Sequence, residues 1–444
     1  MTEATRAPDG SPLRRVIFSG LLGNTIEYYD FLLYGTVSAL VFNRLFFTNL
    51  SPAVATFASF TTFAVGYLAR PVGGLVFGHL GDRYGRKPML LTSMIVMGVA
   101  STLIGVLPTY GTAGNWAPVL LVFLRLCQGI AVGGEWGGST LLAAEHAPPA
   151  RRGLLVGVVQ LGGPLGSVLS TAVLALVSLM PEDGFLTWGW RIPFLFSAAL
   201  LVLGLFVRLK VVESEVFLRS RAADDRQRAP LIELVRRPGQ LLRASFFIFG
   251  ATVTQALTSA FMVSYATGVG IGRSDILLGQ VFNGVGAGIA MLVATALSDR
   301  IGRRHTLIGA ALLLAAVAYP VFAMIGTGDP VLLWIALGLL AAPPMGALLA
   351  PSAALLAESF DTGVRYTGVS VGYQFAAVLG GGLAPLIGVS LLSLGGGNPV
   401  LVAAYMAAAC LASAVAVWSA KETRGRDLVA PVAAAPETVL TSQS

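Results

Sequence analysis

Charged residues are rare in this sequence. Only 11% of its 444 residues are Asp, Glu, Lys or Arg, whereas soluble domains carry about 25%. So few charges cannot cover a water-facing surface, which excludes a soluble enzyme, a disordered chain and a fibrous protein. Cysteine is scarcer still, because Cys127 and Cys410 are the only two and both lie inside apolar runs. The sequence therefore predicts no disulfide framework and no metal site.

Long apolar runs make up most of the chain. Hydrophobic residues amount to 55%, and the mean hydropathy is +0.77. Because about 20 apolar residues cross a bilayer as a helix, the sequence predicts an all-α membrane protein with twelve transmembrane helices. The predicted spans are residues 16–43, 52–79, 88–108, 117–147, 153–180, 189–210, 241–270, 275–298, 306–327, 331–358, 364–392 and 398–420.

Basic residues are distributed unevenly between the two sides of these spans. An even number of spans puts both termini on one side, and 24 of the 29 Lys and Arg residues fall there. Arg208, at the very end of the sixth span, is counted with the loop that follows it. Three lie on the other side, and Arg70 and Arg125 lie within spans. Since cytoplasmic loops carry the excess of Lys and Arg, we expect both termini in the cytoplasm. The bias also accounts for the net charge of +7 without nucleic acid.

One long polar stretch separates the first six spans from the last six. It is expected to be a solvated linker, with a membrane-surface regulatory element as the alternative. The predicted organisation is an N-terminal cytoplasmic segment (1–15), a first six-helix half (16–210), a cytoplasmic linker loop (211–240), a second six-helix half (241–420) and a disordered cytoplasmic tail (421–444).

The two halves share short charged motifs. The sequence GDRYGRK at 81–87 returns in similar form as SDRIGRR at 298–304. A second pattern, Ala-Glu at 144–145 with Arg at 152, returns 213 residues later at 357–358 and 365. Such a repeat predicts a duplicated unit with its substrate site between the halves. We expect the repeated charges to form a gate at the cytoplasmic face, although plain membrane anchors or surface pairs are the alternative. The predicted gating residues are Asp82, Arg83, Arg86, Glu145, Arg152, Asp299, Arg300, Arg303, Glu358 and Arg365.

A family resemblance rests on these loops and on four further stretches. Residues 78–87 resemble the signature loop of the major facilitator superfamily, and residues 125–133 resemble its span-4 motif. Residues 24–35, 67–74 and 133–138 are similar to the metabolite:proton symporter family within it, most of all to shikimate permeases. The resemblance covers about residues 14–421. It implies a transporter that carries a metabolite such as shikimate, 2-oxoglutarate, citrate, proline or betaine together with protons.

Five ionisable residues lie within the predicted spans of the first half. Three are acidic and two are basic, which leaves one negative charge over, as a proton carrier needs. Depth along the helices predicts one layer with Asp30 and Arg125, and a second with Glu27, Arg70 and Glu135. The alternative is a set of permanent ion pairs that tie spans 1, 2 and 4 together. Asp30, Glu27 and Glu135 are the predicted proton-coupling residues.

The second half contributes only neutral candidates. A binding site with arginine on the wall formed by the first half, and with amides and phenols on the wall formed by the second half, suits a hydroxylated monocarboxylate. A tricarboxylate would require more cations, because each carboxylate must be paired once it is desolvated. The predicted substrate-binding residues are Arg125, Arg70, Tyr34, Asn24, Gln128, Gln160, Gln255, Asn283, Tyr373 and Gln374.

These observations predict proton-coupled uptake of a small organic acid by alternating access. A proline/betaine symporter and a dicarboxylate symporter are alternatives, and Gly163-Pro164 weakly suggests a drug:proton antiporter. The sequence contains no recognisable pairing of a nucleophile with a base, so an enzyme is not expected. The proton is the coupling ion and no cofactor is expected. The expected partners are the organic acid and the lipid bilayer, with no nucleic acid. The expected form is a monomer that crosses a bacterial-type plasma (inner) membrane many times.

Overall fold

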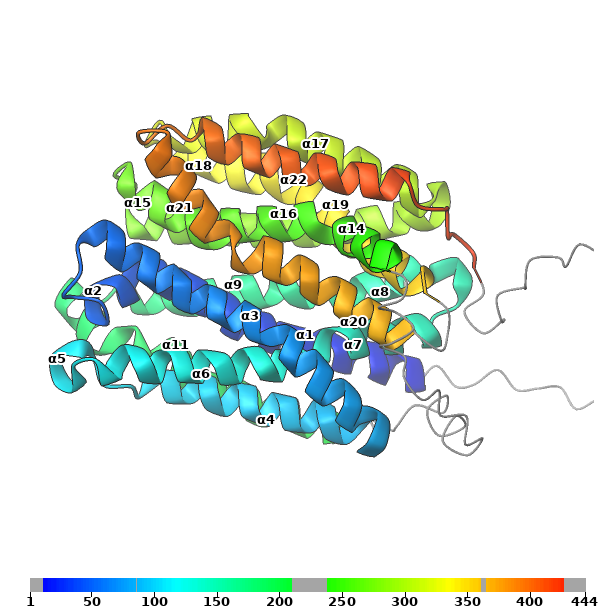
Figure 1. The fold of residues 1–444 in the computed structure, drawn as a ribbon, viewed down its shortest axis with the longest axis horizontal. Coiled ribbons are helices and arrows are strands. Elements are labelled where there is room, and N and C mark those ends of the chain that lie inside the picture. The colour runs from blue at the N-terminus through cyan, green and yellow to red at the C-terminus, as the bar shows by residue number, and fades with distance from the viewer. Residues whose placement is uncertain (1–10, 85, 210–237, 361–364, 427–444) are drawn as a thin grey trace, which may run out of the picture.

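The computed structural model describes residues 11–84, 86–209, 238–360 and 365–426, apart from the side chains of residues 11–12, 78–79, 81–84, 86–87 and 366. This part of the chain is a bundle of helices that run roughly along one axis, with short connections at both ends (Figure 1). α1 (Ser11–Val37) begins and α22 (Val400–Trp418) ends at the same end, on the right in Figure 1, which we call the terminal end. The described chain contains no β-strand, so the predicted all-α fold is confirmed.

The helices before residue 210 are called the first half here, and those after residue 237 the second half. The first half continues after α1 with η1 (Ser38–Phe42), α2 (Asn43–Leu45), α3 (Pro52–Tyr84), α4 (Arg86–Gly105), α5 (Tyr110–Ala113), α6 (Trp116–Val132), α7 (Glu135–His146), η2 (Pro149–Arg151), α8 (Arg152–Gln160), α9 (Gly162–Val177), α10 (Glu182–Gly184), η3 (Phe185–Gly189) and α11 (Arg191–Leu209). The second half, which ends with α22, contains α14 (Pro238–Ala256), η4 (Leu257–Phe261), α15 (Met262–Gly268), α16 (Arg273–Ile301), α17 (Arg303–Ile325), α18 (Pro330–Ile335), η5 (Ala336–Ala341), α19 (Ala342–Glu358), α20 (Arg365–Ala376), η6 (Ala377–Gly382) and α21 (Ala384–Leu394). The predicted linker lies almost entirely outside the described residues.

Eleven helical stretches of the described chain are long and apolar enough to cross a membrane. They coincide with predicted spans two to twelve, and their ends differ from the prediction by a few residues. The first predicted span is also one continuous helical stretch, from α1 through η1 to α2, but Glu27 and Asp30 lower its mean hydropathy. α1 tolerates these side chains because nearly all of residues 23–39 are buried among other helices.

The two halves meet along a long internal interface. Within the first half α1 packs on α9, α3 on α6 and α4 on α11, while in the second half α16 packs on α19, and α22 on α14 and α17. Between the halves α16 packs on α8 and α9, and α20 with η6 packs on α3 and α7. Helices α1, α3, α14 and α20 therefore surround the centre of the molecule, where the candidate site lies.

Glycines bring α3 and α6 into backbone contact in the first half. A Cβ atom on Gly129 would lie 2.0 Å from the carbonyl oxygen of Gly66, and one on Gly133 would lie 2.1 Å from that of Arg70. Only glycine permits such a close approach of two backbones. This contact sets the positions of Arg70 on α3 and Arg125 on α6.

Candidate functional site

A narrow cleft opens between the two halves near the centre of the bundle. Helices α1 and α3 form one wall, and α14, α20 and η6 form the other. The cleft has room for about one water molecule, so its side chains nearly fill it. It is lined by Glu27, Tyr28, Phe31, Leu32, Tyr67, Arg70, Thr252, Gln255, Tyr373, Ala377 and Gly381.

Arg70 is the cation of this cleft. Its side chain is buried, and its guanidinium carbon lies 3.9 Å from the ring centre of Phe31 and 4.2 Å from that of Tyr67. Its Nε atom has no hydrogen-bond partner, and none of the ion pairs found in the described chain includes Arg70. A buried cation without a bonded anion is costly unless a ligand completes it. Arg70 is thus available to an anion that enters the cleft.

Glu27 is the acidic residue of the cleft. It is buried one helical turn before Asp30, and its Oε2 atom has no hydrogen-bond partner in the described chain. Arg70, Glu135 and Arg208 are the charged groups that act on it electrostatically. The predicted grouping of Glu27 with Arg70 and Glu135 therefore corresponds to a real cluster, without a direct Glu27–Arg70 ion pair.

Aromatic side chains close the cleft toward the terminal end. The hydroxyl groups of Tyr28 and Tyr373 share a hydrogen bond of 3.0 Å across the two halves. The ring of Tyr373 also stacks on Trp136, with ring centres 3.7 Å apart. Gln374, next along α20, donates a hydrogen bond of 2.8 Å to the carbonyl oxygen of Gly133. These contacts must separate before the cleft can open toward the terminal end.

Arg125 occupies a separate position inside the first half, outside the lining of the cleft. Its guanidinium carbon lies 3.8 Å from the ring centre of Phe31 and 4.1 Å from that of Tyr34. Its Nη1 atom donates a hydrogen bond of 3.0 Å to Gln128, whose amide nitrogen donates one of 2.7 Å to Ser101. Two of the predicted substrate-binding residues, Tyr34 and Gln128, thus hold Arg125.

Asp30 lies in the same layer as Arg125 but is not directly paired with it. Its Oδ1 atom accepts a hydrogen bond of 2.5 Å from the hydroxyl of Ser197 on α11, and Ser101 lies beside it. Its Oδ2 atom is buried without a hydrogen-bond partner in the described chain. Gln128 and Ser101 stand between the two charges. The predicted layer is therefore present, while direct pairing is replaced by a chain of polar groups.

The expected position of Arg208 is wrong. The sequence interpretation assigned it to the loop after the sixth span, but α11 continues to Leu209 and turns Arg208 inward. Arg208 forms a buried ion pair with Glu135 and donates a hydrogen bond of 2.8 Å to the carbonyl oxygen of Leu90. Apart from Arg152, which is buried at the terminal end, the six buried charges described in the first half then balance, three against three, which corrects the predicted negative excess. They are Glu27, Asp30, Glu135, Arg70, Arg125 and Arg208.

The remaining predicted substrate-binding residues divide between the cleft and the packing around it. Gln255 lines the cleft together with Tyr373. Asn24 donates a hydrogen bond of 3.2 Å to the carbonyl oxygen of Val159, which ties α1 to α8. Gln160 accepts one of 3.2 Å from the indole of Trp136. Asn283 is buried on α16 and is not part of the lining.

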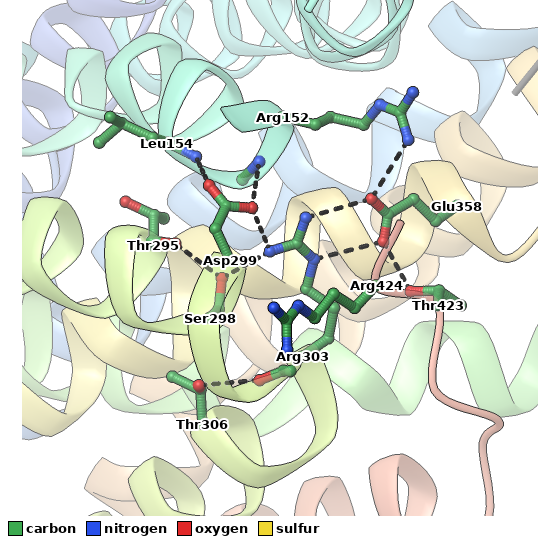
Figure 2. Close-up of polar contacts among 12 residues, drawn as sticks. Arg152, Leu154, Thr295, Ser298, Asp299, Arg303, Thr306, Glu358, Thr423 and Arg424 are labelled. Atoms are coloured by element: carbon green, nitrogen blue, oxygen red, sulfur yellow. Dashed lines mark hydrogen bonds and ion pairs between the residues drawn. The ribbon is translucent and has the colours of Figure 1, made fainter. Parts of the chain in front are cut away.

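A charged network joins the two halves at the terminal end (Figure 2). Glu358 on α19 accepts hydrogen bonds of 3.3 and 3.2 Å from Arg303, and lies 3.6 Å from Arg152 of the first half. Arg303 also pairs with Asp299, one turn earlier, at 2.6 Å. Four predicted gating residues are therefore brought together by helices from both halves.

Asp299 also caps the first helix turn of α8. Its carboxylate accepts hydrogen bonds of 3.0 and 2.9 Å from the backbone N–H groups of Gly153 and Leu154 (Figure 2). An acidic group is favourable at a helix N-terminus, where backbone N–H groups are unpaired. α16 of the second half is thereby attached to α8 of the first.

The other predicted gating residues do not belong to this network as described. Arg300 is exposed, and Arg365 donates a hydrogen bond of 3.2 Å to the carbonyl oxygen of Phe360. Glu145 is half-buried near the start of η2. The side chains of Asp82, Arg83 and Arg86 lie outside the described residues.

The start of the predicted disordered tail is ordered, which corrects that expectation for residues 421–426. Thr423 donates a hydrogen bond of 2.6 Å to Glu358, and Arg426 donates one of 2.7 Å to the carbonyl oxygen of the same residue. Glu422 accepts hydrogen bonds from the backbone N–H groups of Arg303 and Arg304. Burial opposes its charge, but these and two further backbone N–H groups hold the pKa of Glu422 below its usual range.

Sequence reasoning missed several residues that the structure places at these sites. A signal for Arg208 was present, because it directly follows the apolar run of the sixth span. A signal for Tyr67 was also present, because it lies one helical turn before Arg70. Ser101 and Ser197 carry no signal, because isolated serines are common in membrane helices. Only the helix packing brings them to Asp30.

Comparison with known proteins agrees with this architecture. The family model described as sugar (and other) transporter matches residues 16–240 and 222–430. A shikimate transporter of Escherichia coli (strain K12) is 40% identical over 95% of this chain and 98% of its own length. A proline/betaine transporter of Salmonella typhimurium is 31% identical over 97% of this chain and 87% of its own.

Among solved structures, the proton:xylose symporter XylE bound to 6-bromo-6-deoxy-D-glucose has the same fold. The TM-score is 0.77 at 19% identity, over 94% of this chain and 98% of that one. These relatives are transporters rather than enzymes. The chain therefore belongs to the sugar (and other) transporter family of the major facilitator superfamily, and is a multi-pass membrane transporter of small molecules.

Proposed function

We propose that this transporter takes up a small hydroxylated monocarboxylate together with a proton, by alternating access across a bacterial-type inner membrane. The observation that carries the proposal is Arg70, a buried arginine that faces a cleft between the two halves without an ion-pair partner in the described chain. We further propose that the protein works as a monomer with its terminal end in the cytoplasm, because 23 of its 29 basic residues belong there once the buried Arg208 is set aside.

Arg70 is a better candidate for the substrate cation than Arg125. A guanidinium binds a carboxylate through two parallel hydrogen bonds, which requires free N–H groups that face the ligand. Arg125 already donates to Gln128 and lies behind Phe31, outside the cleft. Arg70 lines the cleft directly, and its Nε atom has no hydrogen-bond partner among the described residues.

The rest of the cleft suits a substrate with hydroxyl groups and a single carboxylate. Tyr28, Tyr67, Tyr373, Thr252 and Gln255 offer hydroxyl and amide groups around the one cation. A di- or tricarboxylate would bring additional charges for which the lining has no second cation, and each unpaired charge is costly after desolvation. The similarity to a shikimate transporter agrees with this substrate class.

The charge balance of the first half supports a proton as the second cargo. Apart from Arg152, which lies beside Glu358 in the terminal-end network, the three buried acids and three buried bases described in the first half are neutral when all are ionised. An anionic substrate therefore adds one uncompensated negative charge. A proton on one carboxyl restores neutrality at the lowest cost. Glu27 and Asp30 are the proposed carriers, because each has one buried oxygen without a hydrogen-bond partner in the described chain. Glu135 is committed to Arg208.

Alternating access requires the terminal-end network to break and re-form. In the described conformation Arg152, Asp299, Arg303 and Glu358 hold the halves together at that end. We propose that this network closes the cytoplasmic side while substrate and proton enter from outside. Breaking it together with the Tyr28–Tyr373 contact would open the cleft inward.

A proline/betaine symporter is the second candidate, because one relative carries that name and the cleft is rich in aromatic residues. Aromatic faces bind quaternary ammonium groups. However, Arg70 already lies on the rings of Phe31 and Tyr67. A zwitterion also adds no net charge and would require no proton for balance. We therefore favour the monocarboxylate.

Uptake into proteoliposomes tests the proposal. The purified protein would be reconstituted, and labelled shikimate, citrate, lactate, proline and glycine betaine would be supplied with the interior alkaline. We expect shikimate to accumulate above its external concentration, and an uncoupler to abolish the accumulation. Accumulation that persists with the uncoupler would contradict proton coupling. Preference for proline or betaine would contradict the substrate class.

A further inference from the structure

The ring of Phe31 lies between two arginines. The guanidinium carbons of Arg70 and Arg125 lie 3.9 and 3.8 Å from its centre, respectively. Two guanidinium groups this close to one ring centre would collide on the same face, so they occupy opposite faces. Phe31 is 2% exposed and lines the cleft. Its ring is therefore the partition between the cleft and the position of Arg125.

The two sides of this partition hold different partners. On the cleft side Arg70 lies near Glu27 and Tyr67, without an ion pair in the described chain. On the other side Arg125 is bonded to Gln128, which leads through Ser101 toward Asp30.

The ionisable groups around Asp30 come from several helices. Arg125 on α6 is the cation beside it, and Tyr29 precedes it on α1. Glu27 lies one turn before Asp30 on α1, close to Arg70 on α3. Glu135 on α7 and Arg208 on α11 are paired with each other beyond Glu27.

Two cations on one ring influence each other in a dry interior. The faces of an aromatic ring attract cations, while the cations repel each other because little solvent screens them. When a carboxylate neutralises Arg70, the surroundings of Arg125 and Asp30 become less positive, and a proton on Asp30 becomes more favourable. The ring also blocks the carboxylate from reaching Arg125.

We propose that Phe31 is a positioning residue that couples the substrate position at Arg70 to a proton position at Asp30 by holding Arg70 and Arg125 on its two faces. This inference rests on the proposed function, because it concerns how the two cargoes are linked. Without the ring, Arg125 is free to pair permanently with Asp30, and the substrate carboxylate is free to reach either arginine. Transport then continues without its link to the proton.

Substitution of Phe31 tests the coupling in proteoliposomes. Phe31→Leu removes the aromatic faces and Phe31→Tyr keeps them. Phe60→Leu removes another buried phenylalanine, on α3, for which no cation contact is found among the described residues. The proton-to-shikimate ratio would be measured with a pH-sensitive dye and labelled shikimate. Exchange would be measured separately at equal pH on both sides. Apparent melting temperatures would establish that each variant is folded.

We expect the proton-to-shikimate ratio of Phe31→Leu to fall at least tenfold, and by a larger factor than its exchange rate, since Phe31 also lines the cleft. Phe31→Tyr and Phe60→Leu should keep the native ratio. If Phe31→Leu yields no folded protein, Phe31→Met, which is similar in volume, takes its place. A native ratio in the folded non-aromatic variant, or an equal loss in Phe60→Leu, would overturn the inference alone. Shikimate uptake by the native protein without proton movement would overturn the proposed function and the inference together.

Discussion

Arg152 of the first half and Glu358 of the second lie 3.6 Å apart at the terminal end, and both are buried (Figure 2). Glu358 also binds Arg303, so one carboxylate holds two arginines. A buried charge that loses its partner is strongly destabilising. Separation of the two halves at this end is therefore possible only if water or other groups replace these contacts together.

Glu358→Gln should loosen this network. The substitution leaves Arg152 and Arg303 without a carboxylate, and loss of one partner of a buried pair costs about 3–5 kcal/mol. The amides of Gly153 and Leu154, which Asp299 caps, should then exchange with deuterium roughly tenfold faster or more. Arg300→Gln is the matched control, because Arg300 is exposed. Unchanged exchange in Glu358→Gln would show that the network does not hold the halves together.

Arg70→Gln should weaken substrate binding. It removes the one cation that lines the cleft, and truncating a buried charged contact costs about 2–5 kcal/mol, which corresponds to at least a ~30-fold higher Kd. Binding of labelled shikimate to purified protein measures this change. Arg44→Gln, at an exposed pair with Glu182, should leave the Kd unaltered. Equal affinity in Arg70→Gln and the native protein would remove Arg70 from the substrate site.

Asp30→Asn should separate exchange from accumulation. The amide cannot be charged, so the variant should exchange labelled for unlabelled shikimate, while accumulation under an imposed pH gradient falls at least tenfold. The neutral form of the group already has Ser197 as a partner, so folding should be retained. Accumulation at the native level by Asp30→Asn would exclude Asp30 as the proton carrier. The same assay on Glu27→Gln decides whether the second carboxyl on α1 shares that role.

The buried pair of Glu135 and Arg208 offers a double-mutant test. Either Glu135→Gln or Arg208→Gln leaves one charge without its partner, and each should lower the stability by about 3–5 kcal/mol. The double variant leaves no unpaired charge, so its loss should fall short of the sum of the two single losses by a coupling energy of about 1–3 kcal/mol. Apparent melting temperatures measure this. Additive losses would mean that the two side chains do not interact.

Glu422 should stabilise the terminal end in a pH-dependent way. Its pKa is held below the usual range by backbone N–H groups, so its contribution is present above the ordinary carboxyl range and is lost as the pH falls through the lowered pKa. Glu422→Ala should lower stability at pH 7 by about 0.5–1 kcal/mol, since it removes a helix cap that is partly exposed. The difference in melting temperature from the native protein should shrink in acid. A difference that stays constant with pH would contradict the role of its charge.

Much of the architecture follows from local sequence alone. Each span can be predicted because a bilayer requires about 20 apolar residues with an internally bonded backbone, whatever surrounds them. Glu27, Asp30, Arg70 and Arg125 could be singled out for the same reason, because a charge at that depth has a cost that does not depend on its neighbours. The loop motif at 298–304 likewise predicted charged contacts at the terminal end, which Asp299 and Arg303 make.

Which charges meet depends on how the helices rotate and approach one another, and a sequence carries no such information. Arg208 was assigned to a loop, yet the extension of α11 turns it toward Glu135. The sequence predicted both Arg125 and Arg70 as substrate-binding residues, but glycine contacts between α3 and α6 and the ring of Phe31 put only Arg70 in the cleft. Composition and periodicity thus determined the membrane helices and their buried charges, because those depend on depth. Only tertiary packing decided the partners, because pairing depends on the direction in which each side chain points.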